Sequence, residues 1–190
     1  MRLLFFGPQG AGKGTQAGLL SPHLGVPHIS TGDLFHANVA DDTPLGREAA
    51  AAVNAGELVP DVVTQGMLAD RLRQPDAQAG FLLDGFPRNP AQADWLDHWL
   101  VGTPGLDAVV LLTAPVDLLI ERALRRGRSD DTEESLRRRL AIYRESTQPL
   151  LDFYGPLVIP VDGVGPVELI HQQIVAKLAS VNPVALAAGH

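Results

Sequence analysis

The sequence contains no cysteine, so disulfide bonds and thiolate metal sites are excluded. It also lacks any stretch that approaches the roughly 18 apolar residues of a membrane span, and its opening apolar run is too short for the core of a signal peptide. We therefore expect a cytoplasmic protein with no membrane partner.

Positive charge is scarce overall and concentrated in one segment. The chain has 15 Lys and Arg residues against 22 Asp and Glu residues, which gives a formal net charge of −7. An acidic balance of this kind disfavours nucleic acid and anionic membranes as general partners, because both repel the protein. Eight of the cationic side chains nevertheless lie between Arg122 and Arg144.

Short apolar runs alternate with helical patterns along the chain. With 190 residues and 45% hydrophobic content, one substantial core can form. The pattern predicts an α/β protein, a three-layer sandwich in which helices flank a parallel sheet of about five strands. The expected strands are Arg2–Phe6, Pro27–Ser30, Gly80–Asp84, Asp107–Leu112 and Pro156–Pro160.

The segment 31–59 interrupts this alternation with two short helical patterns. We interpret it as a small helical insert in a core made of residues 1–30 and 60–181. Residues 182–190 contain a proline and no periodic pattern, so we expect a loosely held tail.

Four glycines surround a single lysine directly after the first expected strand. Gly7, Gly10, Gly12 and Gly14 let the backbone curl so that several N–H groups converge, and a helix that begins near Lys13 adds partial positive charge there. This combination predicts a phosphate-binding loop. The match to G-x-x-x-x-G-K-[ST] is incomplete, since Gly14 takes the hydroxyl position and Thr15 follows one residue later.

Two other interpretations of the same stretch remain open. Gly12, Gly14 and Ala17 spell G-x-G-x-x-A, with Asp33 about twenty residues beyond, as in the dinucleotide-binding sites of nicotinamide oxidoreductases. In that motif the first glycine follows the strand directly, whereas Gly12 lies several residues after Phe6. The third possibility is a flexible loop without a ligand.

A second motif, Asp84-Gly85-Phe86-Pro87-Arg88, follows the strand that ends in GFLLD. A carboxylate at this place can hold Mg²⁺ directly or through water, and the planar guanidinium of Arg88 can donate two hydrogen bonds to an anion. An ordinary Asp-Gly turn is the alternative.

Helical geometry sorts the clustered arginines. Arg122 and Arg126 are four residues apart and share one helix face, while Arg139 lies at the edge of the buried stripe of the next helix. Asp131 with Glu134 predicts a capping box at the start of that helix. A solvated outer face is expected for Arg125, Arg137, Arg138 and Arg144.

Together with Ser30-Thr31-Gly32-Asp33 and Arg128-Ser129-Asp130-Asp131, the two motifs occur in the order seen in nucleoside monophosphate kinases. From Met1 to about Ala179 the chain resembles an adenylate kinase, and Gly-Lys-Gly-Thr is the form that this family uses. The resemblance implies reversible, Mg²⁺-dependent phosphoryl transfer in which ATP and AMP give two ADP. It also implies that the acidic pair Asp130-Asp131 orients the neighbouring arginines.

The resemblance assigns residues to three groups. Catalytic roles would fall to Lys13, Arg88, Arg126, Arg128 and Arg139. The ATP site would contain Gly10, Ala11, Gly12, Lys13, Gly14, Thr15, Arg122, Arg126 and Gly165. The AMP site would contain Thr31, His36, Glu57, Leu58, Val59, Gly85, Phe86, Pro87, Arg88, Gln92, Arg128 and Arg139. Asp84 would hold Mg²⁺, most simply through water.

The chain departs from the family pattern at two places. His36 stands where the family usually has an arginine for the AMP phosphate, and because histidine is mostly uncharged at pH 7, weaker AMP binding is expected there. Residues 126–131 form only a remnant of the usual lid, which predicts more ATP hydrolysis by water. Without cysteine, the structural zinc of some relatives is excluded.

The acceptor is expected to be AMP. Gln92 offers a donor and an acceptor for an adenine edge, and CMP and UMP kinases typically differ there and at the Thr31 position. A CMP or UMP kinase remains the nearest alternative, and a nucleotide-binding regulatory module without catalysis is a second. We expect a monomer whose partners are ATP, AMP and ADP.

Overall fold

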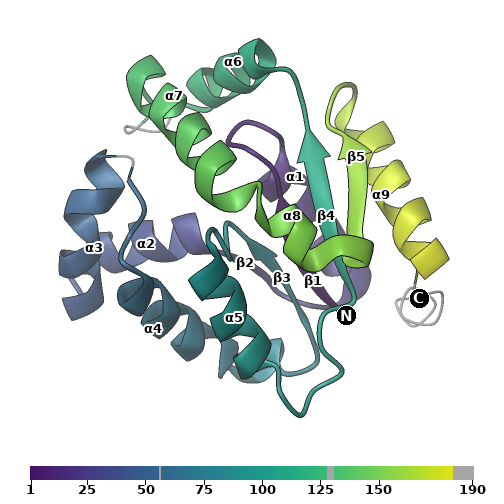
Figure 1. The fold of residues 1–190 in the computed structure, drawn as a ribbon, viewed down its shortest axis with the longest axis horizontal. Coiled ribbons are helices and arrows are strands. Elements are labelled where there is room, and N and C mark those ends of the chain that lie inside the picture. The colour runs from purple at the N-terminus through teal and green to yellow at the C-terminus, as the bar shows by residue number, and fades with distance from the viewer. Residues whose placement is uncertain (56, 128–130, 182–190) are drawn as a thin grey trace.

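Five parallel strands form a central sheet in this computed structural model, which describes residues 1–55, 57–127 and 131–181 (Figure 1). The strand order is β2-β3-β1-β4-β5, so the first strand lies in the middle. The predicted fold class is confirmed. The strands are β1 (Arg2–Phe6), β2 (His28–Ser30), β3 (Phe81–Asp84), β4 (Ala108–Thr113) and β5 (Val158–Asp162).

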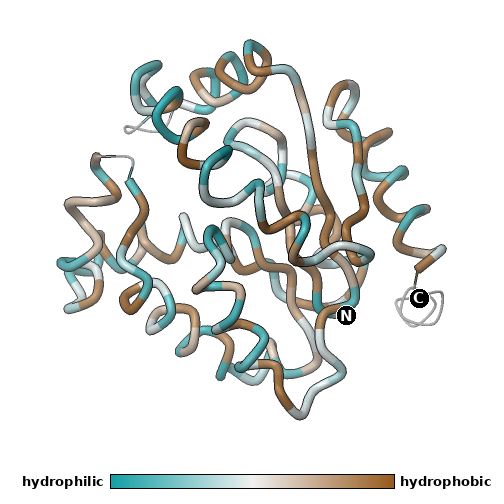
Figure 2. Tube along the Cα trace, viewed as in Figure 1, coloured by the Kyte–Doolittle hydropathy of each residue, from teal (hydrophilic) through white to brown (hydrophobic). Residues whose placement is uncertain are grey.

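Strand β1 is buried on both faces, as its unbroken apolar run predicts. Leu3 and Phe5 belong to one hydrophobic cluster and Leu4 and Phe6 to another, because successive side chains of a strand point to opposite faces. Figure 2 shows the strands as a hydrophobic centre inside more polar helices.

Helices cover both faces of this sheet. The cluster that holds Leu3 and Phe5 includes side chains of α1 (Lys13–Leu24), α6 (Val116–Arg126), α7 (Glu133–Ile142) and α9 (Val167–Val181). The opposite cluster includes side chains of α4 (Asp61–Leu72), α5 (Pro90–Trp99) and α8 (Leu150–Tyr154). Each face of the sheet is thereby closed to water.

Helices α2 (Thr31–Ala40) and α3 (Pro44–Ala55) lie to one side of the sheet in Figure 1. They share a small cluster with the first turns of α4, made of Phe35, Ala49, Val59, Val63 and Met67. A separate core of this kind is what the predicted helical insert requires, although the division of the chain at residues 31–59 stays a prediction.

Strand β5 begins two residues later than predicted. Gly155–Leu157 forms a short 3₁₀ turn, and the strand then extends to Asp162, opposite Thr113 of β4. Within the three described ranges, no helix has both the length and the apolar character needed to cross a bilayer. The predicted loose tail, residues 182–190, lies outside the described residues.

Candidate active site

A cavity of about 780 Å³ opens at the carboxyl edge of the sheet, between the insert and helices α6 and α7. Parallel strands all end at this edge, which is where ligands of open α/β sheets bind. Except for Arg128, which lies outside the described residues, every predicted site residue lines this cavity. These are Gly10, Ala11, Gly12, Lys13, Gly14, Thr15, Thr31, His36, Glu57, Leu58, Val59, Asp84, Gly85, Phe86, Pro87, Arg88, Gln92, Arg122, Arg126, Arg139 and Gly165.

The loop between β1 and α1 forms one wall of the cavity, and two of its glycines could not carry a side chain. Gly7 (φ 136°) and Gly10 (φ 84°) both adopt a backbone conformation that favours glycine. A Cβ atom would lie 2.3 Å from the Leu112 carbonyl oxygen at Gly7 and 2.1 Å from the Leu119 carbonyl oxygen at Gly10. The loop is therefore packed closely against the end of β4 and against α6.

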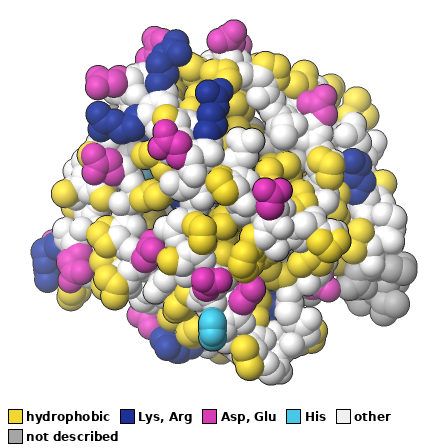
Figure 3. Space-filling model, viewed as in Figure 1, with side chains coloured by type: hydrophobic (Ala, Val, Ile, Leu, Met, Phe, Trp, Pro, Cys, Tyr) yellow, Lys and Arg dark blue, Asp and Glu magenta, His cyan; other side chains and the backbone are white. Residues whose placement is uncertain are grey.

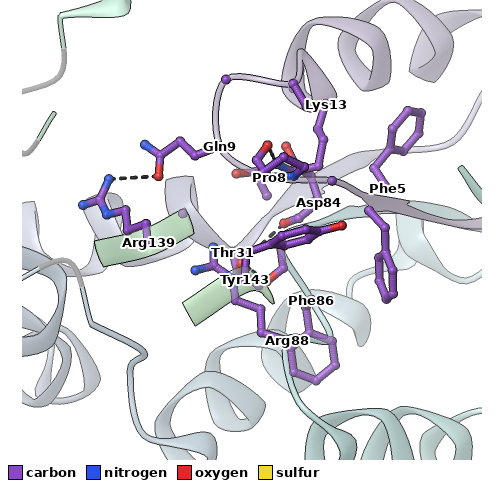
Figure 4. Close-up of a pocket in the computed structure, with 18 of the residues that line it drawn as sticks. Phe5, Pro8, Gln9, Lys13, Thr31, Asp84, Phe86, Arg88, Arg139 and Tyr143 are labelled. Carbon is purple, nitrogen blue, oxygen red and sulfur yellow. Dashed lines mark hydrogen bonds and ion pairs between the residues drawn. The ribbon is translucent and has the colours of Figure 1, made fainter. Parts of the chain in front are cut away.

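The first turn of α1 faces the cavity with its backbone N–H groups. Gly12, the N-cap residue of the helix, adopts the left-handed conformation and has no side chain with which to cap the first turn. The amides and the helix dipole are thus directed toward an anion. The Lys13 ammonium lies beside them, donating to the Pro8 carbonyl oxygen at 3.1 Å (Figure 4).

Asp84 ends β3 and lies next to Phe5 of β1 and Ser30 of β2. Its carboxylate is 3.9 Å from Lys13 Nζ and 3.7 Å from His28 Nε2. Burial raises the pKa of Asp84, but the charge of Lys13, contact with His28 and the more distant Arg88 outweigh burial, so the net pKa is lowered. The group is an anion at neutral pH.

Such a carboxylate is suited to Mg²⁺, which prefers oxygen ligands and often takes only one or two carboxylates besides phosphate and water. Among the described residues, no cluster of three or more acidic, histidine or cysteine side chains could enclose a metal by itself. An ion held by Asp84 would then take its other ligands from water and from a bound molecule.

Arg88 and Thr31 are both anchored to the backbone of Gly85. The Arg88 Nε donates to the Gly85 carbonyl oxygen at 2.8 Å, and the Thr31 hydroxyl donates to the same oxygen at 3.0 Å. Burial lowers the pKa of Arg88, Asp84 raises it, and Arg139 lowers it further, for a net decrease. Arg88 is a pre-oriented cation in a partly desolvated place.

Gln92 is buried and bonded within the protein. Its Oε1 accepts from the Arg88 backbone N–H at 2.7 Å, and its Nε2 donates to Asp61 at 2.8 Å. Asn89, which caps α5, also donates to Asp61. A side-chain amide has two N–H groups and two acceptor lone pairs, so one of each remains for a base.

Three arginines of α6 and α7 reach the cavity. Arg126 donates to Asp131 through Nε and Nη2, with distances of 2.9–3.1 Å, and Arg139 Nη1 lies 3.4 Å from the same carboxylate. Arg122 Nη1 donates to the Gly163 carbonyl oxygen at 2.8 Å, close to the loop that holds Gly165.

The predicted capping box at Asp131 is wrong. Thr132 caps α7 instead, accepting from the Ser135 N–H at 3.2 Å. The carboxylate of Asp131 is directed toward the two arginines, whose charge attracts it more strongly than a neutral amide would. Its partner Asp130 lies outside the described residues.

Two of the remaining arginines of α6 and α7 form ion pairs at the surface, and a third makes an unexpected contact. Arg125 and Arg137 pair with Glu121 and Glu133 of their own helices, and Figure 3 shows cations and acidic groups intermixed over α6 and α7. Arg138 is exposed, as predicted, but its Nη1 also donates to the Ala55 carbonyl oxygen at 3.1 Å. It thereby connects α7 with the end of α3.

The cavity is also lined by residues that the sequence did not assign to the site, among them Gln9, His28 and Tyr143. Tyr143 continues the helical stripe of α7 into a short π-helical segment. The helical pattern of the sequence could therefore have predicted its position. Gln9 lies inside the glycine loop, but nothing in the sequence indicates where its side chain points.

Comparison with known proteins identifies one family. A sequence model of the adenylate kinase family matches residues 5–157. Adenylate kinases of Nocardia farcinica and Corynebacterium aurimucosum are each 54% identical to this chain, over 94% and 91% of its length and 99% and 96% of theirs. An adenylate kinase of Corynebacterium glutamicum is 52% identical over 94% of this chain and 99% of its own.

Proposed function

The chain belongs to the adenylate kinase family, and from this premise we infer how its own residues bind ATP and AMP and transfer the phosphoryl group between them. It is a nucleoside monophosphate kinase, a phosphotransferase that forms two ADP from ATP and AMP. Membership of this family rejects the nicotinamide oxidoreductase alternative. The assignments below are supported by the geometry of the cavity.

The ATP phosphates bind against the glycine loop, where the N–H groups from Gly10 to Thr15 and the Lys13 ammonium converge. Arg122, fixed on the Gly163 carbonyl, lies against the adenine, and the backbone at Gly165 contacts the edge of the base. Open space surrounds Gly165, so a flat ring can approach it closely.

AMP occupies the side of the cavity formed by the insert. Gln92 reads the adenine with its second N–H and second lone pair, beside Thr31 and the segment Glu57–Val59. The phosphate of AMP lies near Arg88, with His36 facing the same space.

Phosphoryl transfer requires positioning and charge neutralisation more than acid or base chemistry. The two nucleotides together bring about six negative charges at neutral pH. Lys13, Arg88, Arg126 and Arg139 line the cavity and offset these charges where the phosphates meet, and Arg128 follows in sequence.

Adenylate kinases use Mg²⁺ with ATP, and Asp84 is the residue that would hold it here, directly or through water. When bound, Mg²⁺ neutralises charge on the phosphate oxygens. Asp84 also keeps Lys13 oriented, because the ammonium is 3.9 Å from its carboxylate.

One observation carries this proposal: the glycine loop, Asp84 and the inward arginines of α6 and α7 line a single cavity. A coupled assay of ADP formation from MgATP with AMP, CMP, UMP and GMP tests it. We expect AMP to be the best acceptor. Faster transfer to CMP or UMP would support the nearest alternative, and tight nucleotide binding without ADP formation would support the regulatory module.

All assigned residues that the structure describes belong to one chain and one cavity. A single copy therefore suffices for both nucleotides, and a monomer is the proposed state. Light scattering during gel filtration measures the molar mass directly and would contradict the proposal if it gave a dimer.

A further inference from the structure

Gln9 links the glycine loop to a helix far away in sequence. Its Nε2 donates to Asp131 Oδ1 at 2.9 Å, and its Oε1 accepts from Arg139 Nη1 at 3.1 Å. Figure 4 shows the Gln9 side chain extending from the loop toward Arg139 across the mouth of the cavity. The nitrogen and the oxygen of the Gln9 amide thus form hydrogen bonds with Asp131 and Arg139, respectively.

The partners of Gln9 are themselves joined. The carboxylate of Asp131 is fully buried and accepts hydrogen bonds from Arg126 as well as from Arg139. A buried carboxylate of this kind is costly to leave without partners, so the cluster is stable only as a unit. Gln9 is a member of this cluster that belongs to the phosphate-binding loop.

A neutral amide suits this place better than any charged side chain. Its oxygen faces a guanidinium and its nitrogen faces a carboxylate, so each end meets a complementary group. In the reverse orientation the amide oxygen would face the Asp131 carboxylate and the amide nitrogen would face the Arg139 guanidinium, and neither pair could form a hydrogen bond. The orientation of the amide is therefore fixed. Either charge at residue 9 would attract one partner and repel the other.

We propose that Gln9 is a positioning residue that holds Arg139 and Asp131 in register with the phosphate-binding loop. This inference rests on the proposed function, since Arg139 is assigned to the phosphates in transit. A guanidinium carries five N–H groups, and Gln9 engages one of them, so the contact aims Arg139 without replacing it as a phosphate ligand. Small errors in such placement slow a reaction strongly.

The test is Gln9→Met, which keeps the length of the side chain and removes both hydrogen bonds. We expect kcat for ADP formation to fall about fivefold to tenfold and the KM for ATP to change less than about twofold, because the lost contact aligns groups for the transition state. Gln78→Met is the matched control, since the Gln78 side chain donates to the Leu72 carbonyl oxygen and does not line the cavity. It should leave kcat unchanged.

A double-variant cycle separates positioning from general damage to the loop. If Gln9 acts through Arg139, Gln9→Met should lower kcat by less than about twofold when Arg139 is already Met. An equal loss in both backgrounds would overturn the proposal, as would a wild-type kcat in Gln9→Met. Gln9→Ala repeats the cycle if the methionine variant does not fold, and failure of the wild-type protein to form ADP would refute the proposed function instead.

Discussion

Asp84 retains its charge in a place where burial alone would neutralise it. Lys13, His28 and Arg88 surround the carboxylate and lower its pKa, so cation and anion stabilise each other before any nucleotide binds. The same carboxylate would hold Mg²⁺ during catalysis. The charge of Asp84 would therefore serve both the stability of the fold and the binding of Mg²⁺. Measuring the stability of the protein without nucleotide separates the first role from the second.

The stability of the free protein should depend on Asp84 in a pH-dependent way. Because the folded pKa of Asp84 is lowered, its ionised form stabilises the fold above the unfolded value of about 3.9. That contribution is lost as the pH falls through the folded pKa. We expect the difference in unfolding free energy between wild type and Asp84→Asn to be largest at pH 6 and to shrink at the lowest pH where both fold.

Urea denaturation at a series of pH values measures this difference. A difference that stays constant across the series would show that Asp84 does not titrate differently in the folded and unfolded states. In that case the contacts with Lys13 and His28 would contribute little to the stability of the folded protein.

His36 lines the cavity, and in the proposed AMP site a permanent cation would be more favourable for a phosphate. We expect His36→Arg to lower the KM for AMP about threefold to tenfold at pH 8, with kcat little changed.

Initial rates with varied AMP at pH 8 give the KM for AMP of each protein. Equal KM values in wild type and in His36→Arg would show that a permanent cation at this position does not strengthen AMP binding.

At the level of elements, Arg138 joins α7 to the helical insert. Its guanidinium donates to the Ala55 carbonyl oxygen at the end of α3 and lies 3.9 Å from the Glu57 carboxylate. Arg139 on α7 and Leu58 after α3 lie next to this contact in the sequence, and both line the cavity. The contact should therefore favour the arrangement in which the insert and α7 enclose AMP together.

Arg138→Gln should raise the KM for AMP about twofold and leave the KM for ATP unchanged, because exposed contacts of this kind contribute little free energy. The control is Arg137→Gln, whose native partner is Glu133 on its own helix. Equal effects of the two variants would mean that only the loss of a surface charge matters.

Elements whose sequence carries a local signal were predicted well. The β1 strand and the start of α1 lie where the apolar run and the glycine loop indicated, since both features are dictated by neighbouring residues. The cap of α7 was missed because Asp131 had two uses, and only the folded chain shows that Arg126 and Arg139 are close enough to attract it.

The site residues, like the elements, could be predicted where the sequence carries a local signal. Motif residues such as Lys13 and Asp84 were found because strand ends bring them to one edge of a parallel sheet. Gln9 was not found, because its importance arises from contacts with residues more than 120 positions away. No periodicity encodes a contact of that kind.

On the scale of the whole molecule, an acidic chain with a net charge of −7 assembles a cationic interior site. The inward side chains Lys13, Arg88, Arg122, Arg126 and Arg139 line one cavity, whereas Arg125 and Arg137 are paired with glutamates on the surface. The long-range field of the protein thus repels polyanions in general, while the cavity binds small phosphates that fit it. We expect this separation to favour free nucleotides over nucleic acid as ligands.

The overall architecture of the molecule also determines how well water is excluded from the phosphates. Helix α6 ends at Arg126, and Asp131 already contacts that arginine, so little chain is available to cover the cavity. Since lids exclude water from a transferring phosphoryl group, we expect measurable hydrolysis of MgATP in the absence of AMP. Phosphate release measured with and without AMP tests this, and Lys13→Met, which removes the ammonium at the loop, is the control for contaminating hydrolases. A rate equal to that of the control would show that the short connection and the arginines already exclude water as well as a full lid.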